Sequence, residues 1–419
     1  QSLNHSITQS LNHSITQSNM HILQISPQLP YPLDSGGRVA IYNILKYLSR
    51  QHDMTLATFV TEETEPYISA LEPYCRRIIA VKHRTATTKI AMLLNMFTPM
   101  PYTMSKYYSP EMAEQIAKAV HDDEVDLVHI DHLHMAQYVG ALPQTMPAVL
   151  REHNVESTIM RRFAEQSVHP FIKLYANIQS RRLHQYEGQI ASQFDRCVAV
   201  TEVDGQTLRD MMPDTQVDVV PDGVDTDWFN PDALEIQVDP LRLVTTGDYG
   251  WAPTADGLMY FVQEIFPLIR EKRPDITFSI VGRQPPDAIQ NMNQGIEILG
   301  RVEDVRPEIM RGAVFVAPTR IGSGIRLKIL EAMALQRPVV STSVGCEGID
   351  AESETHLLIA DDPAAFAASV IRLLEDEAFR TTMTGNAARL IEKKYTWHAL
   401  ARQLSDTYED IVRKRKDNG

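Results

Sequence analysis

The sequence predicts an α/β protein built from two Rossmann-like, doubly wound domains that face a central cleft. Short apolar runs alternate with amphipathic helical stretches along most of the 419 residues, and this alternation is typical of parallel βαβ units. It is interrupted at 217–234, where VDVVPDGVDTDWFNPDAL concentrates Pro, Gly and Asp. The length also suits two or three domains of ordinary size. Together these observations indicate two similar halves joined by a linker.

The overall composition is that of an ordinary globular protein with an acidic excess. The chain is 43% hydrophobic and carries 40 Lys and Arg against 54 Asp and Glu, a formal net charge of −14. This excess argues against a general nucleic-acid binder. We therefore expect no nucleic-acid partner. The three cysteines are far apart and form no disulfide framework, so we expect a reducing, cytoplasmic location. No apolar run approaches the roughly 20 residues of a membrane span.

The first half begins after a polar repeat. Residues 1–19 contain QSLNHSIT twice in tandem, and we expect them to form a disordered leader. The N-terminal domain is expected at 20–220, with a strand at 21–26 and a helix at 39–50, where apolar residues recur at helical spacing. Further strands are expected at 54–60, 77–82, 125–130, 148–153 and 197–201, and further helices at 66–75, 88–97, 110–123 and 157–193.

The second half repeats the alternation. A linker is expected at 221–235, a C-terminal domain at 236–396, and a last helix within 397–419 that crosses back to the N-terminal domain. The C-terminal strands are expected at 241–247, 276–282, 296–300, 314–319, 338–345 and 357–361, and the helices at 255–272 and 325–335, with two closing helices around 363–393 and 397–413.

Ligands of doubly wound sheets bind beyond the carboxyl ends of the strands, which selects the loops to inspect. The first is Asp34-Ser35-Gly36-Gly37-Arg38. Its two glycines allow close backbone approach to a ligand, and a helix N-terminus favours an anion. The loop lacks the GxGxxG pattern, and no acidic residue ends the second strand, which disfavours dinucleotide binding. A tight turn without a ligand is the alternative.

Two further loops carry polar side chains in the first half. His129, Asp131, His132 and His134 follow or end a strand, but their spacing matches no specific metal motif, so we expect them to line the cleft. Arg151-Glu152-His153-Asn154 ends the next strand and suits a polyhydroxylated substrate, with His153 a candidate for proton transfer. Ordinary surface polarity and local ion pairing are the respective alternatives.

The richest loop lies in the second half. Gly322-Ser323-Gly324 precedes a helix, so its backbone N–H groups and the helix dipole favour a phosphate. Arg326 and Lys328 are expected in the first helical turn, where cations oppose the dipole; pairing with a bound diphosphate explains them. Glu331 is one turn further on and suits a vicinal diol such as that of ribose.

These residues belong to a stretch, GSGIRLKILEAMALQRPVVSTSVGCEGI, that resembles the retaining, nucleotide-sugar-dependent glycosyltransferases of family 4, which have the GT-B fold. The form is that of a bacterial subgroup linked to exopolysaccharide synthesis. The likeness covers nearly everything from Met20 to about Val412. Other segments that carry it are PYPLDSGGR, VVPDGVDTDWFNP, TTGDYGWAPTADGLMYF, FSIVGRQPP, GRVEDVRP and YTWHALARQLSDTY.

The resemblance assigns a nucleotide-sugar site. Glu331 matches the second of two family glutamates and would contact ribose, whereas the first falls on Ser323. The loop at Gly247 lacks the two cations common in the family, so Arg326 and Lys328 would take over their contact with the diphosphate. The residues implied on the donor side are Gly36, Gly37, Gly247, Arg283, Arg301, Ser323, Gly324, Ile325 and Glu331. The residues implied on the acceptor or sugar side are Asp131, His132 and Asn154, with His153 beside them.

The resemblance implies sugar transfer from a nucleotide diphosphate sugar to a glycan or lipid-linked acceptor, with retained configuration. It implies no metal, no cofactor and no covalent nucleophile, with Arg326, Lys328 and His153 as the catalytic side chains. The segment TKIAMLLNMF, with Lys82, Arg84 and Lys89 nearby, suggests peripheral contact with the inner face of a membrane. The alternatives are a sugar-nucleotide epimerase, a phosphorylase, for which no cofactor lysine stands out, or a non-catalytic glycan-binding protein.

Overall fold

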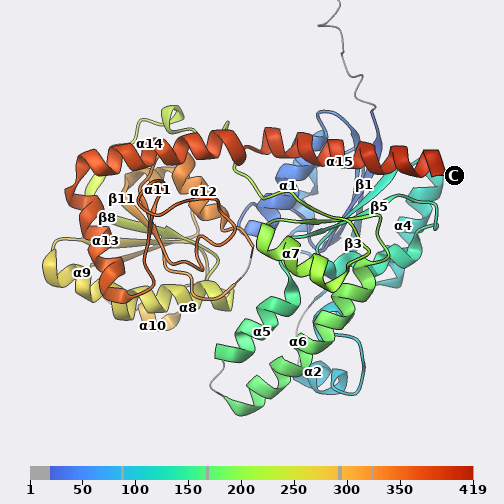
Figure 1. The fold of residues 1–419 in the computed structure, drawn as a ribbon, viewed down its shortest axis with the longest axis horizontal. Helices are drawn as coiled ribbons and strands as arrows, with labels where there is room; N and C mark the ends of the chain where they lie inside the picture. The colour runs from blue at the N-terminus through green and yellow to red at the C-terminus, as the bar shows by residue number, and fades with distance from the viewer. Residues whose placement is uncertain (1–18, 86–88, 167–168, 291–294, 323, 419) are drawn as a thin grey trace, which may run out of the picture.

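The computed structural model describes residues 19–85, 89–166, 169–290, 295–322 and 324–418. Two separate parallel sheets form two α/β domains (Figure 1), which are the two Rossmann-like halves that the sequence predicts. The leader expected at 1–19 and the donor-side candidate Ser323 lie outside the described residues, apart from Asn19.

The N-terminal sheet has the order β3-β2-β1-β4-β5-β6-β7, and every pair is parallel. Its strands are β1 (His21–Ser26), β2 (Asp53–Val60), β3 (Arg77–Lys82), β4 (Leu127–Asp131), β5 (Ala148–Glu152), β6 (Arg196–Ala199) and β7 (Val217–Val219). The helices of this half are α1 (Gly36–Leu48), α2 (Lys89–Asn95), α3 (Tyr102–Ser105), α4 (Pro110–Asp122), α5 (Glu156–Gln166), α6 (Pro170–Ala191) and α7 (Glu202–Met211).

The C-terminal sheet has the order β10-β9-β8-β11-β12-β13 and is also parallel. Its strands are β8 (Asp239–Thr246), β9 (Thr277–Val281), β10 (Ile296–Gly300), β11 (Gly312–Ala317), β12 (Val339–Ser341) and β13 (Leu358–Ile359). The helices are α8 (Ala252–Tyr260), α9 (Phe266–Lys272), α10 (Asp287–Gln290), α11 (Arg306–Arg311), α12 (Leu327–Ala334), α13 (Pro363–Glu375), α14 (Glu377–Lys394) and α15 (Trp397–Asn418).

Three expected helices differ in detail. The stretch expected at 157–193 forms two helices, α5 and α6, because Pro170 occupies the first turn of α6, where a missing N–H costs nothing. The stretch expected at 66–75 forms two short 3-10 turns, each with Pro near its start. The helix expected at 255–272 holds a π-helical turn at Phe261–Ile265, between α8 and α9.

The last helix, α15, leaves the C-terminal domain and packs on α1 of the N-terminal domain (Figure 1). Trp397 is 0% exposed, and Leu404 and Tyr408 follow on the same buried face. These side chains share one hydrophobic core with Ile22 of β1 and Ile44 of α1. The C-terminal helix therefore forms part of the N-terminal core.

The chain crosses between the domains twice, and the two crossings touch. Val224 N donates to Tyr395 O at 2.8 Å, and Trp397 N donates to Val224 O at 3.3 Å. A Cβ on Gly223 would lie 2.6 Å from both Tyr395 O and Leu400 Cδ1, so this position admits no side chain without movement of the backbone. Among the described residues, no helix is both long and apolar enough to cross a membrane.

Truncating Trp397 tests the contribution of the returning helix to the N-terminal core. The change Trp397→Ala removes a fully buried indole and is expected to lower the free energy of unfolding by about 3–5 kcal/mol. Urea unfolding followed by far-UV circular dichroism measures it. His398→Ala, at the exposed neighbouring position, is the control and should remain within about 0.5 kcal/mol of the wild type. Equal transitions for both variants would contradict a core role for Trp397.

Candidate functional site

The strand orders place one reversal point in each sheet. In the N-terminal sheet the reversal falls between β1 and β4, and in the C-terminal sheet it falls between β8 and β11. The loops that leave these strands are the ones at Gly36, Asp131, Gly247 and Gly324 that the sequence selects. Ligands of doubly wound sheets bind at such reversal points, because the two diverging loops leave a crevice there.

The start of α1 lies against the start of α12 across the two domains. A Cβ on Gly36 would be 3.9 Å from Leu327 Cδ1, and one on Gly37 would be 3.6 Å from His132 Nε2. Neither N-cap side chain, Ser35 for α1 and Arg326 for α12, caps the backbone N–H groups in the first turn of its helix. Both helix N-termini, with their positive dipole ends, therefore meet at the same place.

Arg326 immediately precedes α12, rather than lying within its first turn as the sequence suggests. Its Nη1 donates to Gly324 O at 2.8 Å, and its Nη2 would lie 2.3 Å from a Cβ on Gly322. Burial lowers the pKa of Arg326, and the guanidinium of Arg162 acts in the same direction. The guanidinium thus lies folded over the glycine turn that leads into α12.

Lys328 and Glu331 lie on successive turns of α12. Lys328 Nζ donates to Thr246 O at 3.3 Å, and no carboxylate within the described ranges is at ion-pair distance from it. Burial, together with Arg326, lowers the pKa of Lys328 to about 8. Burial raises the pKa of Glu331 to about 7, although Lys328 partly opposes this. Both groups therefore titrate close to neutral pH, which is common at binding sites.

The glycine turn also contacts the N-terminal domain. Gly324 has φ +77°, and a Cβ there would be 2.6 Å from both Asn154 Oδ1 and His153 O. Arg162 of α5 donates to Gly322 O and forms a two-pronged ion pair with Glu347, at 2.9 and 3.1 Å. Arg162 and Glu347 were missed in the sequence, because they carry no local pattern and meet only through the domain arrangement.

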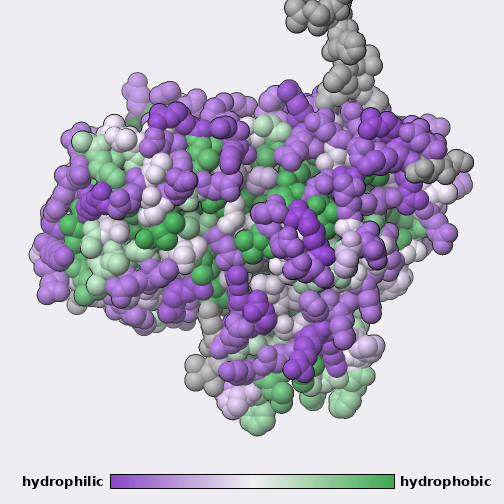
Figure 2. All heavy atoms as spheres, in the orientation of Figure 1, coloured by the Kyte–Doolittle hydropathy of each residue, from purple (hydrophilic) through white to green (hydrophobic). Residues whose placement is uncertain are grey.

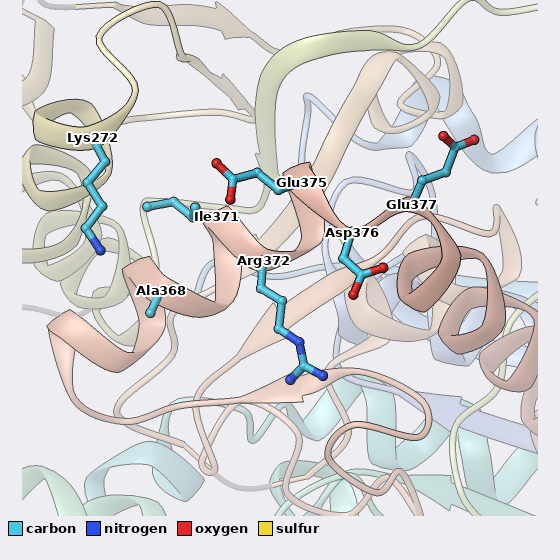
Figure 3. A pocket seen from close by; sticks show the side chains of 7 residues that line it. All are labelled: Lys272, Ala368, Ile371, Arg372, Glu375, Asp376 and Glu377. Carbon is cyan, nitrogen blue, oxygen red and sulfur yellow. The ribbon is translucent and has the colours of Figure 1, made fainter.

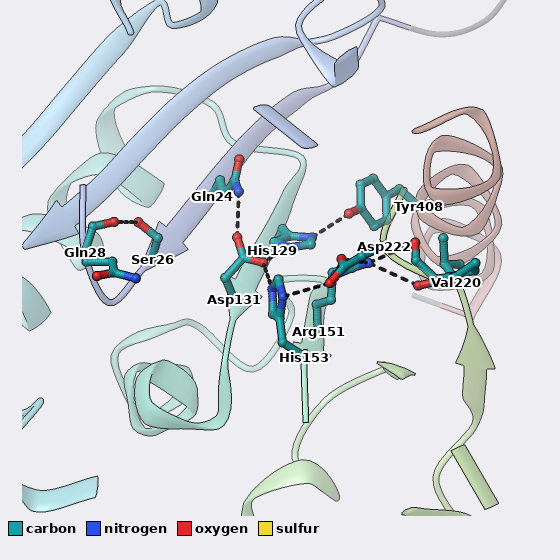
Figure 4. Close-up of polar contacts among 11 residues, drawn as sticks. Gln24, Ser26, Gln28, His129, Asp131, Arg151, His153, Val220, Asp222 and Tyr408 are labelled. Carbon is teal, nitrogen blue, oxygen red and sulfur yellow. Dashed lines mark hydrogen bonds and ion pairs between the residues drawn. The ribbon is translucent and has the colours of Figure 1, made fainter. Parts of the chain in front are cut away.

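A buried polar network supports the N-terminal side (Figure 4). Asp131 is 0% exposed and accepts from Gln24 Nε2 at 2.6 Å. His129 Nε2 and His153 Nε2 both lie 3.1 Å from its Oδ1. Burial alone would raise the pKa of Asp131, but the two histidines hold it well below its usual range. Asp131 therefore acts on the cleft through His153 rather than by direct contact.

His153 lies between two carboxylates. Its Nδ1 is 3.6 Å from Asp222 Oδ2, opposite the contact of Nε2 with Asp131. Burial alone would lower the pKa of His153, but Asp222 and Asp131 raise it above its usual value. Both ring nitrogens thus face carboxylates, which does not fit the proton transfer expected of His153. The two carboxylates favour the charged form of the ring instead. Asp222 was missed, since it lies in the linker.

His132 lies beside this network and is largely buried. Its ring stacks on that of His153, with centroids 4.0 Å apart and an interplanar angle of 13°. Its backbone has φ +67°. Burial and the neighbouring His153 and His134 hold the pKa of His132 well below its usual range. The neutral form of His132 is thus favoured beside a His153 ring whose pKa is raised, next to Gly37.

The remaining donor-side candidates are Arg283, Gly247, Ile325 and Arg301, and their surroundings differ. Arg283 joins the domains, since it lies 2.7 Å from Asp248 and 3.4 Å from Asp34. Gly247 lies so close to Gly282 that a Cβ on Gly282 would meet Gly247 O at 1.8 Å. Ile325 packs against the C-terminal core. Arg301 is exposed at the end of the edge strand β10, and no contact in the described part of the chain joins it to the others.

Two hollows in the C-terminal domain differ in their distance from this site. A small pocket beside it is lined by Thr245, Tyr249, Thr254, Gly257, Thr319 and Lys328. The hollow in Figure 3 lies between α9 and α13, on helices that cover the C-terminal sheet, and so away from the carboxyl ends of the strands. Across the described segments, no cluster of three or more His, Cys, Asp or Glu is placed to hold a metal ion.

Two family models match the chain. The model described as Glycosyltransferase Family 4 matches 35–228, and the one described as Glycosyl transferases group 1 matches 240–376. An uncharacterized 44.6 kDa protein in the cps region of Klebsiella pneumoniae is 23% identical over 392 residues, which cover 89% of this chain and 96% of that protein. A D-inositol 3-phosphate glycosyltransferase of Salinispora tropica is 28% identical over 266 residues, 55% of this chain and 54% of that protein.

Solved structures share the architecture. Sucrose-phosphate synthase from Thermosynechococcus elongatus matches with a TM-score of 0.72 at 17% identity, over 94% of this chain and 100% of that one. Anabaena HepE in complex with UDP and glucose matches with a TM-score of 0.65 at 13% identity, over 93% and 100% of the two chains. The fold is therefore GT-B, as expected.

The raised pKa of Glu331 predicts a pH-dependent stability. Between the ordinary value of 4.5 and about 7, the folded protein keeps a proton that the unfolded chain has released. The wild type should therefore lose stability as the pH rises through this window, by at most about 1.4 kcal/mol per pH unit for one proton. In Glu331→Gln, the free energy of unfolding should not show this decrease with rising pH.

The measurement is urea unfolding of wild type and variant at several pH values in that window. Glu392→Gln is the matched control, because Glu392 is exposed on α14 of the same domain. If Glu331→Gln and Glu392→Gln show the same slope against pH, Glu331 does not hold the extra proton.

Proposed function

Because the chain belongs to the glycosyltransferases of family 4 with the GT-B fold, we propose that it uses a nucleotide diphosphate sugar as donor. The acceptor is a glycan or a lipid-linked sugar, and the product retains the donor's anomeric configuration. The relative from the cps region of Klebsiella pneumoniae supports a role in exopolysaccharide or other cell-surface glycan synthesis. The reaction takes place in the cytoplasm, at the inner face of the membrane.

The observation that carries this proposal is the pair of cations at the start of α12. Arg326 and Lys328 stand where two helix N-termini meet, and Lys328 has no carboxylate at ion-pair distance among the described residues. A desolvated cation without a fixed counter-ion, as Lys328 is among the described residues, is costly, and an anionic ligand removes that cost. A diphosphate supplies two phosphoryl groups for the two cations and for the backbone N–H groups of both helices.

The placement of the other residues supports further proposed roles. Glu331, one turn along α12, accepts hydrogen bonds from the ribose hydroxyls of the nucleotide. Gly36 and Gly37 let the backbone of α1 approach the phosphates from the other domain. His132 and Asn154 face the sugar and the acceptor, while Asp131 and Asp222 favour the charged form of His153 behind them. Anabaena HepE, whose structure holds UDP and glucose, supports a nucleotide sugar as donor class.

The chemical step is proposed to need no metal and no covalent nucleophile. As the bond to the sugar breaks, negative charge gathers on the departing diphosphate. Arg326, Lys328 and the positive ends of α1 and α12 stabilise that charge, because they are already oriented before the reaction. The oxygen of the acceptor hydroxyl bonds to the anomeric carbon on the face from which the diphosphate departs, and a departing phosphate oxygen takes the hydroxyl proton. Attack on that same face gives retention. Contact between the domains excludes water and limits hydrolysis of the donor.

Donor binding is the direct test of the cation pair. Titration calorimetry with UDP and the other nucleoside diphosphates should give binding to the wild type, and Lys328→Met should weaken it about 10- to 100-fold, as expected for loss of a charge-assisted contact. Lys272→Met, which removes an exposed cation on α9, is the matched control and should bind as the wild type does. A wild type that binds no nucleoside diphosphate or nucleotide sugar would overturn the proposed function.

The stereochemistry and metal requirement are tested together on the transfer product. Proton NMR of the product should show the anomeric configuration of the donor. The rate should be unchanged by an excess of a chelator, because the leaving-group charge is met by side chains. An inverted product excludes the retaining mechanism. If the chelator abolishes the reaction and added Mg²⁺ restores it, metal independence is excluded.

A further inference from the structure

The tip of the N-terminal domain carries large exposed apolar side chains. They come from α2, from the segment after it and from the first turns of α6 (Figure 2). Phe97 is 85% exposed, and Phe171 is 77% exposed. The set, called here the apolar tip, consists of Ile90, Leu93, Leu94, Phe97, Phe171, Ile172 and Leu174. Single exposed apolar residues are normal in soluble proteins, but a gathered set marks an interaction surface.

The two parts of the apolar tip are held together by polar contacts. Arg182 of α6 donates to Asn95 O at 3.0 Å and to Met96 O at 2.8 Å. Gln179 Nε2 donates to Asn95 Oδ1 at 3.2 Å. The end of α2 is therefore fixed to α6, and both elements lie at the same extremity of the domain (Figure 1). These hydrogen bonds hold the apolar side chains of both elements on one exposed surface.

The two segments that carry the apolar tip have a charge opposite to that of the protein. No Asp or Glu occurs at 73–110 or at 166–186, although the chain has 54 of them and a net charge of −14. Lys173 and Arg181 of α6 are exposed, and neither has an ion pair among the residues described. Lys82 and Arg84, which the sequence suggested for membrane contact, are paired instead with Glu65 and Glu62. The cations of α6 thus remain available beside the tip.

Apolar side chains bordered by cations match an anionic bilayer, in which acyl chains lie beneath a layer of phosphates. A second copy of this chain fits less well, because it would bring Lys173 and Arg181 close to their own counterparts, and like charges at an interface oppose association.

We propose that the apolar tip is a membrane-docking surface, in which these side chains enter an anionic phospholipid leaflet while Lys173 and Arg181 contact its phosphates. Its link to the lipid-linked acceptor rests on the proposed function; the docking itself does not. The hairpin of α5 and α6 that carries the tip begins at Glu156, two residues after Asn154 of the acceptor side. Docking therefore orients the acceptor loops relative to the bilayer.

The test is sedimentation of the full chain with vesicles of phosphatidylcholine, alone or with roughly 30% phosphatidylglycerol. The wild type should bind the anionic vesicles and should bind them less in about 1 M salt, where charges are screened beyond about 3 Å. Leu93→Glu/Phe97→Glu and, separately, Lys173→Glu/Arg181→Glu should each lower the partition coefficient at least tenfold. The matched controls are Val238→Glu and Lys272→Glu, both exposed on the other domain.

Circular dichroism and UDP binding of every variant separate docking from folding and from the donor site. Loss of vesicle binding with normal UDP binding supports the proposal, even if the transferase reaction is later excluded. The proposal is overturned if the wild type does not bind anionic vesicles, or if the control variants lose binding equally. It is also overturned if the tip variants convert a dimer to a monomer in light scattering while vesicle binding is unchanged.

Discussion

The arrangement of the cleft depends on one buried ion pair, between Arg151 at the end of β5 and Asp222 in the domain crossing. The Arg151 side chain is 0% exposed, and both its terminal nitrogens contact Asp222 Oδ1, at 3.0 and 3.1 Å. Breaking such a pair costs about 3–5 kcal/mol, because the remaining charge stays buried without a partner. The same carboxylate faces His153. One contact thus sets both the path of the chain out of the first sheet and the charge beside the cleft.

Most of the fold could be predicted from the sequence, because the strands other than β7 coincide with short apolar runs. The short β7 (Val217–Val219) was missed, since its sequence VDV lies in the Pro-, Gly- and Asp-rich stretch that was expected to interrupt the alternation. Contacts between distant segments could not be predicted. Nothing near Arg162 indicates that it meets Glu347, and Asp222 lies in a turn-rich linker, where an aspartate is ordinary. These contacts depend on how two domains sit together, which local patterns do not encode. For the same reason, the sequence predicted His153 at the site but not the two carboxylates that hold its ring nitrogens.

Two pairs of cations in this acidic protein have different physical settings. At the start of α12, Arg326 and Lys328 are desolvated, so their pKa values fall, and their charge is suited to a small, compact anion. On α6, Lys173 and Arg181 are exposed and screened by salt, so they suit an extended anionic surface.

The paired chain crossings have a mechanical consequence. Tyr395 and Val224 are hydrogen-bonded neighbours, and Gly223 leaves no space between the two segments. Both covalent connections of the domains therefore pass through nearly one point. Sliding of one domain along the other would break these hydrogen bonds, whereas rotation about that point would preserve them. Since α15 is part of the N-terminal core, it moves with that domain, and the pivot is confined to the few residues between α14 and α15 and their partner segment at 223–224.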